Sequence, residues 1–168
     1  MPDWALVLVY WLHMMAVLVW LGSIAGLTLL VSPVVSVRLN KAEQLEMIEG
    51  VQARLDSITW FCLFVIVATG LFQMSVNRNY HGLVGIENLW EVAILTKIAL
   101  LIVVAIISGA MSWGITPAIQ HARIRFRKTG EMSQLEALRK REIRLLIIQL
   151  VLAGLILLAT ALARTVSQ

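Results

Sequence analysis

Four apolar stretches, each long enough to cross a bilayer as a helix, limit the possible folds of this 168-residue chain more than any other feature. They cover about residues 4–35, 57–76, 89–117 and 144–163, and a transmembrane helix needs about 20 apolar residues. Hydrophobic residues make up 60% of the chain, whereas soluble domains contain about 45–50%. The sequence therefore predicts an all-α integral membrane protein, with residues 1–168 forming a single four-helix transmembrane domain. Short connections favour an up-down-up-down bundle.

The three polar connections between the apolar stretches differ in charge. The first, residues 38–56, mixes both signs and predicts a short cytoplasmic amphipathic helix, because its apolar residues recur at three- and four-residue steps. The second, residues 77–88, contains one strong base, Arg78. The third, residues 118–143, is strongly basic. It contains the capping-box pattern Ser133-Gln-Leu-Glu136, which predicts a fourth helix over about residues 134–163.

The distribution of lysine and arginine predicts the orientation in the membrane. Eleven of these residues lie in the first and third connections, counting Arg144, whereas Arg78 and Arg164 are the two outside them and outside the spans. The positive-inside rule then predicts that both termini face outward. We attribute the net charge of +4 to the membrane face that meets anionic lipid. The expected partner is the lipid bilayer, and no nucleic acid is expected.

Two ionisable residues, His13 and Lys97, lie well inside predicted spans. His13 is nine residues inward of Trp4 and Lys97 is seven inward of Trp90, or about 13 and 10 Å along a helix. The two side chains are therefore expected at similar depth, and they line one site if helices one and three face each other. Ionisable side chains at such depth usually mark a functional site. The alternatives are an interhelical hydrogen bond from His13 to Thr69 or Gln73, and extension of Lys97 to the headgroups.

Two kinds of ligand fit residues near this depth, and the residues leave both open. Copper(I) prefers soft ligands and imidazole, which His13, Met74 and His81 could supply. Haem b needs one axial imidazole, from His13, and cations for its propionates, from Lys97, Arg78 and Arg164. His81 could equally be a solvated loop residue, and His121 lies too far from His13 to share its site. With one cysteine, Cys62, a cysteine-based metal site within the chain is excluded.

Several short motifs resemble the copper-resistance protein D (CopD) family. They are Leu12-His13-x-x-Ala16-x-x-x-Trp20-Leu21-Gly22 followed by Pro33, then Ala68-Thr69-Gly70-Leu71, and Leu95-Thr96-Lys97-Ile98-Ala99-Leu100 closing at Pro117. The resemblance covers about residues 8–118. It implies a protein of the bacterial inner membrane that binds, transports or confers tolerance to copper.

The histidine in helix one and the lysine in helix three also resemble the HemJ-type protoporphyrinogen oxidases, small four-helix proteins that bind haem b. In that family the matching residues are His13 and Lys97, and the resemblance implies a haem-dependent membrane oxidoreductase. This chain reads Trp-Leu-Gly where those proteins read Trp-Met-Ala-Gly. The residues of the motifs favour the copper-resistance family, whereas the charge of Lys97 favours haem as the ligand. A third hypothesis is a small structural subunit of a larger membrane complex or homo-oligomer.

Overall fold

The computed structural model describes residues 3–34, 41–76, 89–129 and 132–166, and these are helical almost throughout, with no strand among them. The order is α1 (Asp3–Ala25), η1 (Gly26–Val31), α3 (Lys41–Ser75), α4 (Leu89–Ala110), η2 (Met111–Ile115), α5 (Thr116–Thr129) and α6 (Ser133–Val166). Four segments are long and apolar enough to cross a membrane: Asp3–Val34, Gly50–Ser75, Glu91–Phe126 and Ser133–Leu162. The prediction of an all-helical protein with four such segments is confirmed.

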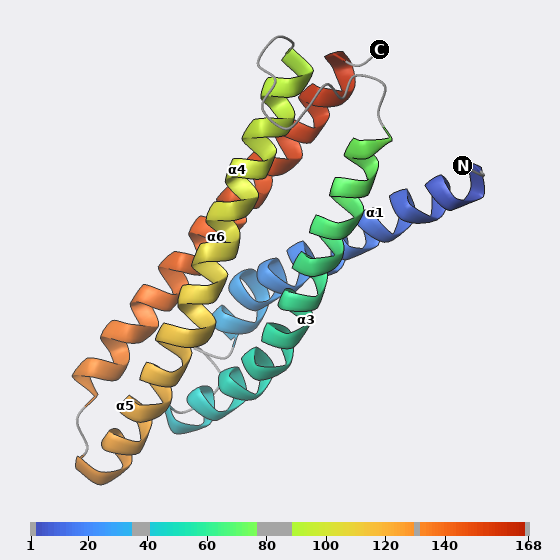
Figure 1. The fold of residues 1–168 in the computed structure, drawn as a ribbon. Coiled ribbons are helices and arrows are strands. Elements are labelled where there is room, and N and C mark those ends of the chain that lie inside the picture. The colour runs from blue at the N-terminus through green and yellow to red at the C-terminus, as the bar shows by residue number, and fades with distance from the viewer. Residues whose placement is uncertain (1–2, 35–40, 77–88, 130–131, 167–168) are drawn as a thin grey trace.

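The helices form two hairpins. α1 packs along α3, and α4 packs along α6. Both chain ends lie at one end of the molecule, opposite the junction of α5 and α6 (Figure 1). We call the end that contains α5 the basic end, because Arg123, Arg125 and Lys128 lie there, and we call the opposite end the terminal end.

Two helices are longer than the sequence analysis predicted. Residues 41–56, expected as a separate amphipathic helix, form the first part of α3 and continue into the span without a break. The third helix, expected to close at Pro117, continues through α5 to Thr129. The start of α6 at Ser133 agrees with the predicted start, and the Glu136 N–H donates to the Met132 carbonyl at 3.0 Å.

A widened helical turn explains how the chain passes Pro117 without ending the helix. A proline in a helix lacks a donor, and its ring clashes with the carbonyl four residues earlier. The π-helical segment η2 ends two residues before Pro117, and the Thr116 N–H bonds to the Met111 carbonyl five residues earlier. This wider turn gives the proline ring the space that an α-turn denies it.

The first hairpin also contains a π-helical turn before a proline, at the same distance from it. The segment η1 also ends two residues before a proline, Pro33, and the Ser32 N–H bonds to the Leu27 carbonyl. Twenty residues separate His13 from Pro33, and twenty separate Lys97 from Pro117. Counted back from each proline, the buried Trp20 and Ile24 match the buried Val104 and Ser108. The first helices of the two hairpins therefore share one plan, with His13 and Lys97 at equivalent positions.

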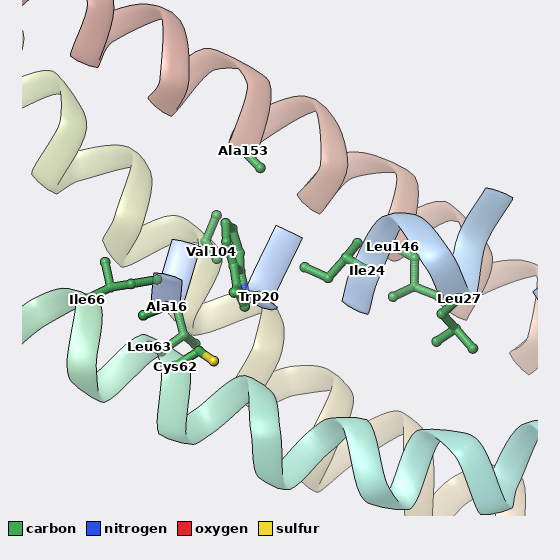
Figure 2. Packing of buried hydrophobic residues seen from close by; sticks show 10 residues of the cluster. All are labelled: Ala16, Trp20, Ile24, Leu27, Cys62, Leu63, Ile66, Val104, Leu146 and Ala153. Carbon is green, nitrogen blue, oxygen red and sulfur yellow. The ribbon is translucent and has the colours of Figure 1, made fainter. Parts of the chain in front are cut away.

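The side chains are distributed as expected for a protein surrounded by lipid. Large apolar residues face outward along every long helix, among them Phe64 (72% exposed) and Trp113 (77% exposed). Several polar side chains are buried instead: His13, Glu91, Ser108, Glu142 and Gln149. A soluble protein shows the opposite preference. The hairpins meet in a core cluster that includes Trp20 of α1, Leu63 of α3, Val104 of α4 and Ala153 of α6 (Figure 2).

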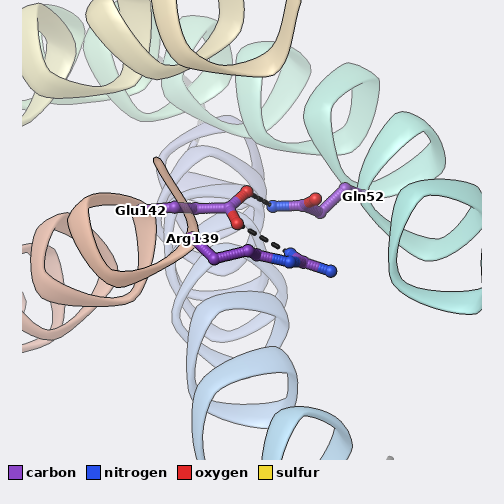
Figure 3. A network of polar contacts seen from close by, with 3 residues as sticks. All are labelled: Gln52, Arg139 and Glu142. Atoms are coloured by element: carbon purple, nitrogen blue, oxygen red, sulfur yellow. Dashed lines mark hydrogen bonds and ion pairs between the residues drawn. The ribbon is translucent and has the colours of Figure 1, made fainter. Parts of the chain in front are cut away.

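A polar contact joins the hairpins nearer the basic end. Glu142 of α6, 1% exposed, accepts a hydrogen bond from the Gln52 amide of α3 and pairs with Arg139 at 2.7 Å (Figure 3). A buried carboxylate is stable only when its oxygens are paired in this way. The Glu142 contact therefore holds α3 and α6 in register.

Removing this carboxylate should destabilise the protein. We expect Glu142→Ala to lower the free energy of unfolding in detergent by about 2 kcal/mol, because the Gln52 amide and the Arg139 guanidinium lose their partner. Arg141→Ala, at an exposed position on the same helix, is the matched control and should change it by less than about 0.5 kcal/mol. Equal unfolding curves for the two variants would show that the contact does not stabilise the fold.

Candidate functional site

The imidazole of His13 is held between the two helices of the first hairpin. His13 is buried on the same face of α1 as Ala16 and Trp20, at helical spacing. Its Nδ1 lies 2.8 Å from the Thr69 hydroxyl of α3. The ring also lies beside Gly70, where an added Cβ would come within 3.6 Å of His13 Cε1. The expected hydrogen bond to Thr69 is present, and the one to Gln73 is not among those of the described chain.

The hydrogen bonds around Thr69 favour one tautomer of His13. The Thr69 hydroxyl carries one hydrogen, which it donates to the Val65 carbonyl one turn earlier at 2.5 Å. It must then accept from His13, so Nδ1 carries the imidazole hydrogen. Nε2 is left with a lone pair and can act as a ligand. An imidazole oriented by a hydrogen bond from its other nitrogen is the usual arrangement of a histidine that binds a metal or haem.

Two buried N–H donors without partners in the described chain lie on the two helices that hold this imidazole. The Gln73 amide nitrogen, one turn after Thr69 on the same face of α3, has no partner in the described chain. The same holds for the indole nitrogen of Trp20, about 10 Å along α1 from His13. A buried donor without an acceptor costs free energy. Both atoms therefore favour a ligand that supplies acceptor oxygens.

Lys97 of the second hairpin stands at the position equivalent to His13. Its side chain is half-buried in α4, seven residues before Val104 of the shared core, just as His13 lies seven residues before Trp20. The shared-site hypothesis assumed that the first and third predicted helices, α1 and α4, lie mainly against each other. Instead, α1 packs chiefly on α3, the second predicted helix. It meets α4 in the core at Trp20 and Val104. The buried carboxyl of Glu91 lies six residues before Lys97 on α4.

The other predicted ligands are placed less closely or lie outside the description. Met74 is half-buried near the end of α3. Arg78 and His81 fall within residues 77–88, outside the described residues. Arg164 falls in the last turns of α6, but its side chain is outside the description. His121 is exposed at the basic end, where its Nδ1 donates to the Pro117 carbonyl at 2.8 Å.

The side chains in this region differ in chemistry from the ligands of a conventional metal site. Among the described residues, no group of three or more histidine, cysteine, aspartate or glutamate side chains could hold a metal ion. One oriented imidazole, one nearby ammonium and unpartnered N–H donors remain. Trp20 and Gln73 could not be selected from the sequence, because a tryptophan and a glutamine in apolar helices are more often packing residues or ordinary hydrogen-bonding groups.

Comparisons of this chain with protein-family models, with curated proteins and with solved structures found no match.

Proposed function

We propose that this protein spans a bacterial inner membrane and binds haem b through Nε2 of His13, as a membrane redox protein. A haem held by one imidazole supplies one-electron chemistry. If the protein is an enzyme, it is a haem-dependent oxidoreductase. The observation that carries the proposal is the buried imidazole of His13 hydrogen-bonded to Thr69. The partnerless amide nitrogen of Gln73 on the same hairpin and Lys97 at the equivalent position of the second hairpin support it.

Charge favours haem over copper, the two ligands that the sequence left open. The haem propionates are anionic and accept hydrogen bonds, so the Lys97 ammonium and the Gln73 amide suit them. A copper ion is a cation, and an ammonium nearby disfavours its binding. Copper handling remains the second candidate because Met74 provides a half-buried thioether, a soft ligand that copper(I) prefers.

The hydroxyl of Thr69 provides a test of this site. Thr69→Val keeps the shape of the side chain and removes the acceptor for Nδ1–H of His13. Loss of such an orienting partner typically weakens binding by roughly 10–100-fold, so we expect that decrease in haem affinity, measured by titrating haem into the apoprotein and following its absorbance. Thr69→Ser retains the hydroxyl and should bind within a few-fold of the parent. Equal affinities for the valine and serine variants would contradict the proposed role of Nε2 as a haem ligand oriented from Nδ1.

The proposed orientation places the basic end in the cytoplasm and both termini outside, in an up-down-up-down arrangement. Its support is the concentration of lysine and arginine at the basic end. In a Cys62→Ala background, Ser167→Cys should react with a membrane-impermeant maleimide in intact cells, and Thr129→Cys should react only after the cells are opened. Labelling of Thr129→Cys in intact cells would show that the orientation is the reverse of the proposed one.

A further inference from the structure

A cavity of about 290 Å³ lies between the two hairpins, nearer the basic end than His13. All four long segments contribute to its wall. Its exposed lining is mainly apolar, with hydroxyl, amide and carboxyl groups from six residues set into it: Ser23, Gln52, Asp56, Thr59, Ser108 and Gln149. Polar groups within the spans of a membrane protein usually face a water-filled cavity or a ligand.

The cavity lies where equivalent positions of the two hairpins meet. Ile24 and Ser108 both line it, and each stands nine residues before its proline. Leu27 and Met111, six residues before the prolines, also form an equivalent pair in its wall. In transporters built from two repeats, substrate sites lie at the interface between the repeats. The position of this cavity corresponds to such a site.

Two polar side chains of the wall are buried and bonded to each other. Gln149, 3% exposed, donates to the hydroxyl of Ser108, 4% exposed, at 2.8 Å. The two come from α6 and α4, so they form one buried polar pair within a mainly apolar wall.

Asp56 determines the sign of the charge that the cavity favours. It is the only charged side chain among the described residues of the wall. It lies at an exposed position and accepts a hydrogen bond from Ser112. One turn before it, Gln52 contacts Glu142, whose charge is matched by Arg139. Towards the terminal end, the core residues Trp20, Leu63 and Val104 separate the cavity from His13. The cavity is thus distinct from the His13 region.

We propose that this cavity is a second binding site, reached from the basic end, for a small hydrogen-bonding cation such as an organic ammonium ion, with Asp56 as its charged partner. The hydroxyl and amide groups accept the N–H hydrogens of the ion, and the carboxylate balances its charge. This site is independent of the haem proposed at His13.

Thiol modification in the detergent-purified full chain tests the proposal. In a Cys62→Ala background, Thr59→Cys is treated with the cationic aminoethyl and the anionic sulfonatoethyl methanethiosulfonates. We expect the ratio of cationic to anionic rates to exceed the ratio for free 2-mercaptoethanol by about tenfold, which corresponds to about 1.4 kcal/mol. Asp56→Asn should return the ratio to the free-thiol value. The arginines of the basic end would by themselves favour the anionic reagent, so a preference for the cation reports on Asp56.

Two further variants guard against misfolding and non-specific access. Thr116→Cys, at a second position in the wall, should show the same preference. Ile58→Cys, adjacent to Thr59 but outside the wall and 39% exposed towards lipid, should react slowly with both charged reagents. Folding of each variant is checked by its elution in size-exclusion chromatography. Unreactive cysteines at both wall positions in folded protein, or a ratio unaffected by Asp56→Asn, would overturn the proposal.

Discussion

His13→Ala should leave the protein inserted and folded but remove its bound haem. The reason for retained folding is that the four long helices have their own backbone hydrogen bonds and a shared apolar core. The reason for haem loss is that Nε2 of His13 is the proposed axial ligand. The measurement is haem per chain in detergent-purified protein, together with the elution volume in size-exclusion chromatography.

His121→Ala is the matched control for that variant. Both histidines have Nδ1 in a hydrogen bond, so each can present Nε2, but His121 is exposed at the basic end. Haem content should remain at the parent level in His121→Ala. If His13→Ala retained as much haem as the parent, the imidazole would be only an interhelical hydrogen-bonding group.

Lys97→Ala should change haem and copper binding in opposite directions. Loss of the ammonium removes the cation proposed to pair with a propionate, and we expect haem affinity to fall by about fivefold, equivalent to about 1 kcal/mol. Copper binding should be unchanged or stronger, because a repelling charge is removed. Both are measured on one preparation by titration with haem and with copper(I).

Lys97→Arg is the conservative control for this position. It keeps the positive charge and donors for a carboxylate, so it should retain more haem than Lys97→Ala. Higher haem affinity in Lys97→Ala than in the parent would contradict the assignment of Lys97 to the propionates.

The number of membrane-spanning helices could be predicted from the sequence because length and hydropathy alone specify them. The helix ends could not, for local reasons. Pro117 suggested a helix end, but the π-helical turn η2 before it lets the helix continue. The polar residues before α3 suggested a separate amphipathic helix, but no break interrupts the helix between Lys41 and Ser75. Residues 41–56 are accordingly continuous with the span.

The candidate site could be predicted only in part. A histidine and a lysine in apolar runs are visible because ionisable residues are rare there. Their partners are decided by packing. Thr69 was one of two suggested partners for His13, and only the geometry selects it and favours one tautomer. The relationship between the hairpins could not be predicted from the sequence either. Trp20 and Val104 stand at the same distance from their prolines, but their side chains are chemically different.

The first apolar stretch contains the pattern Gly22-x-x-x-Gly26. A GxxxG pattern often brings two helices into close contact. Here an added Cβ at Gly22 or Gly26 would meet no atom within 4 Å. These glycines therefore do not support close packing within the described part of the chain.

The absorption spectrum of the detergent-purified parent protein, with iron and copper measured in the same sample, tests the central claim most directly. A haem b bound by His13 predicts a Soret band, bands in the visible region that sharpen on reduction, and about one iron per chain. A colourless protein that contains copper and no iron, from cells supplied with both metals and with haem, would contradict the haem assignment and favour the copper site.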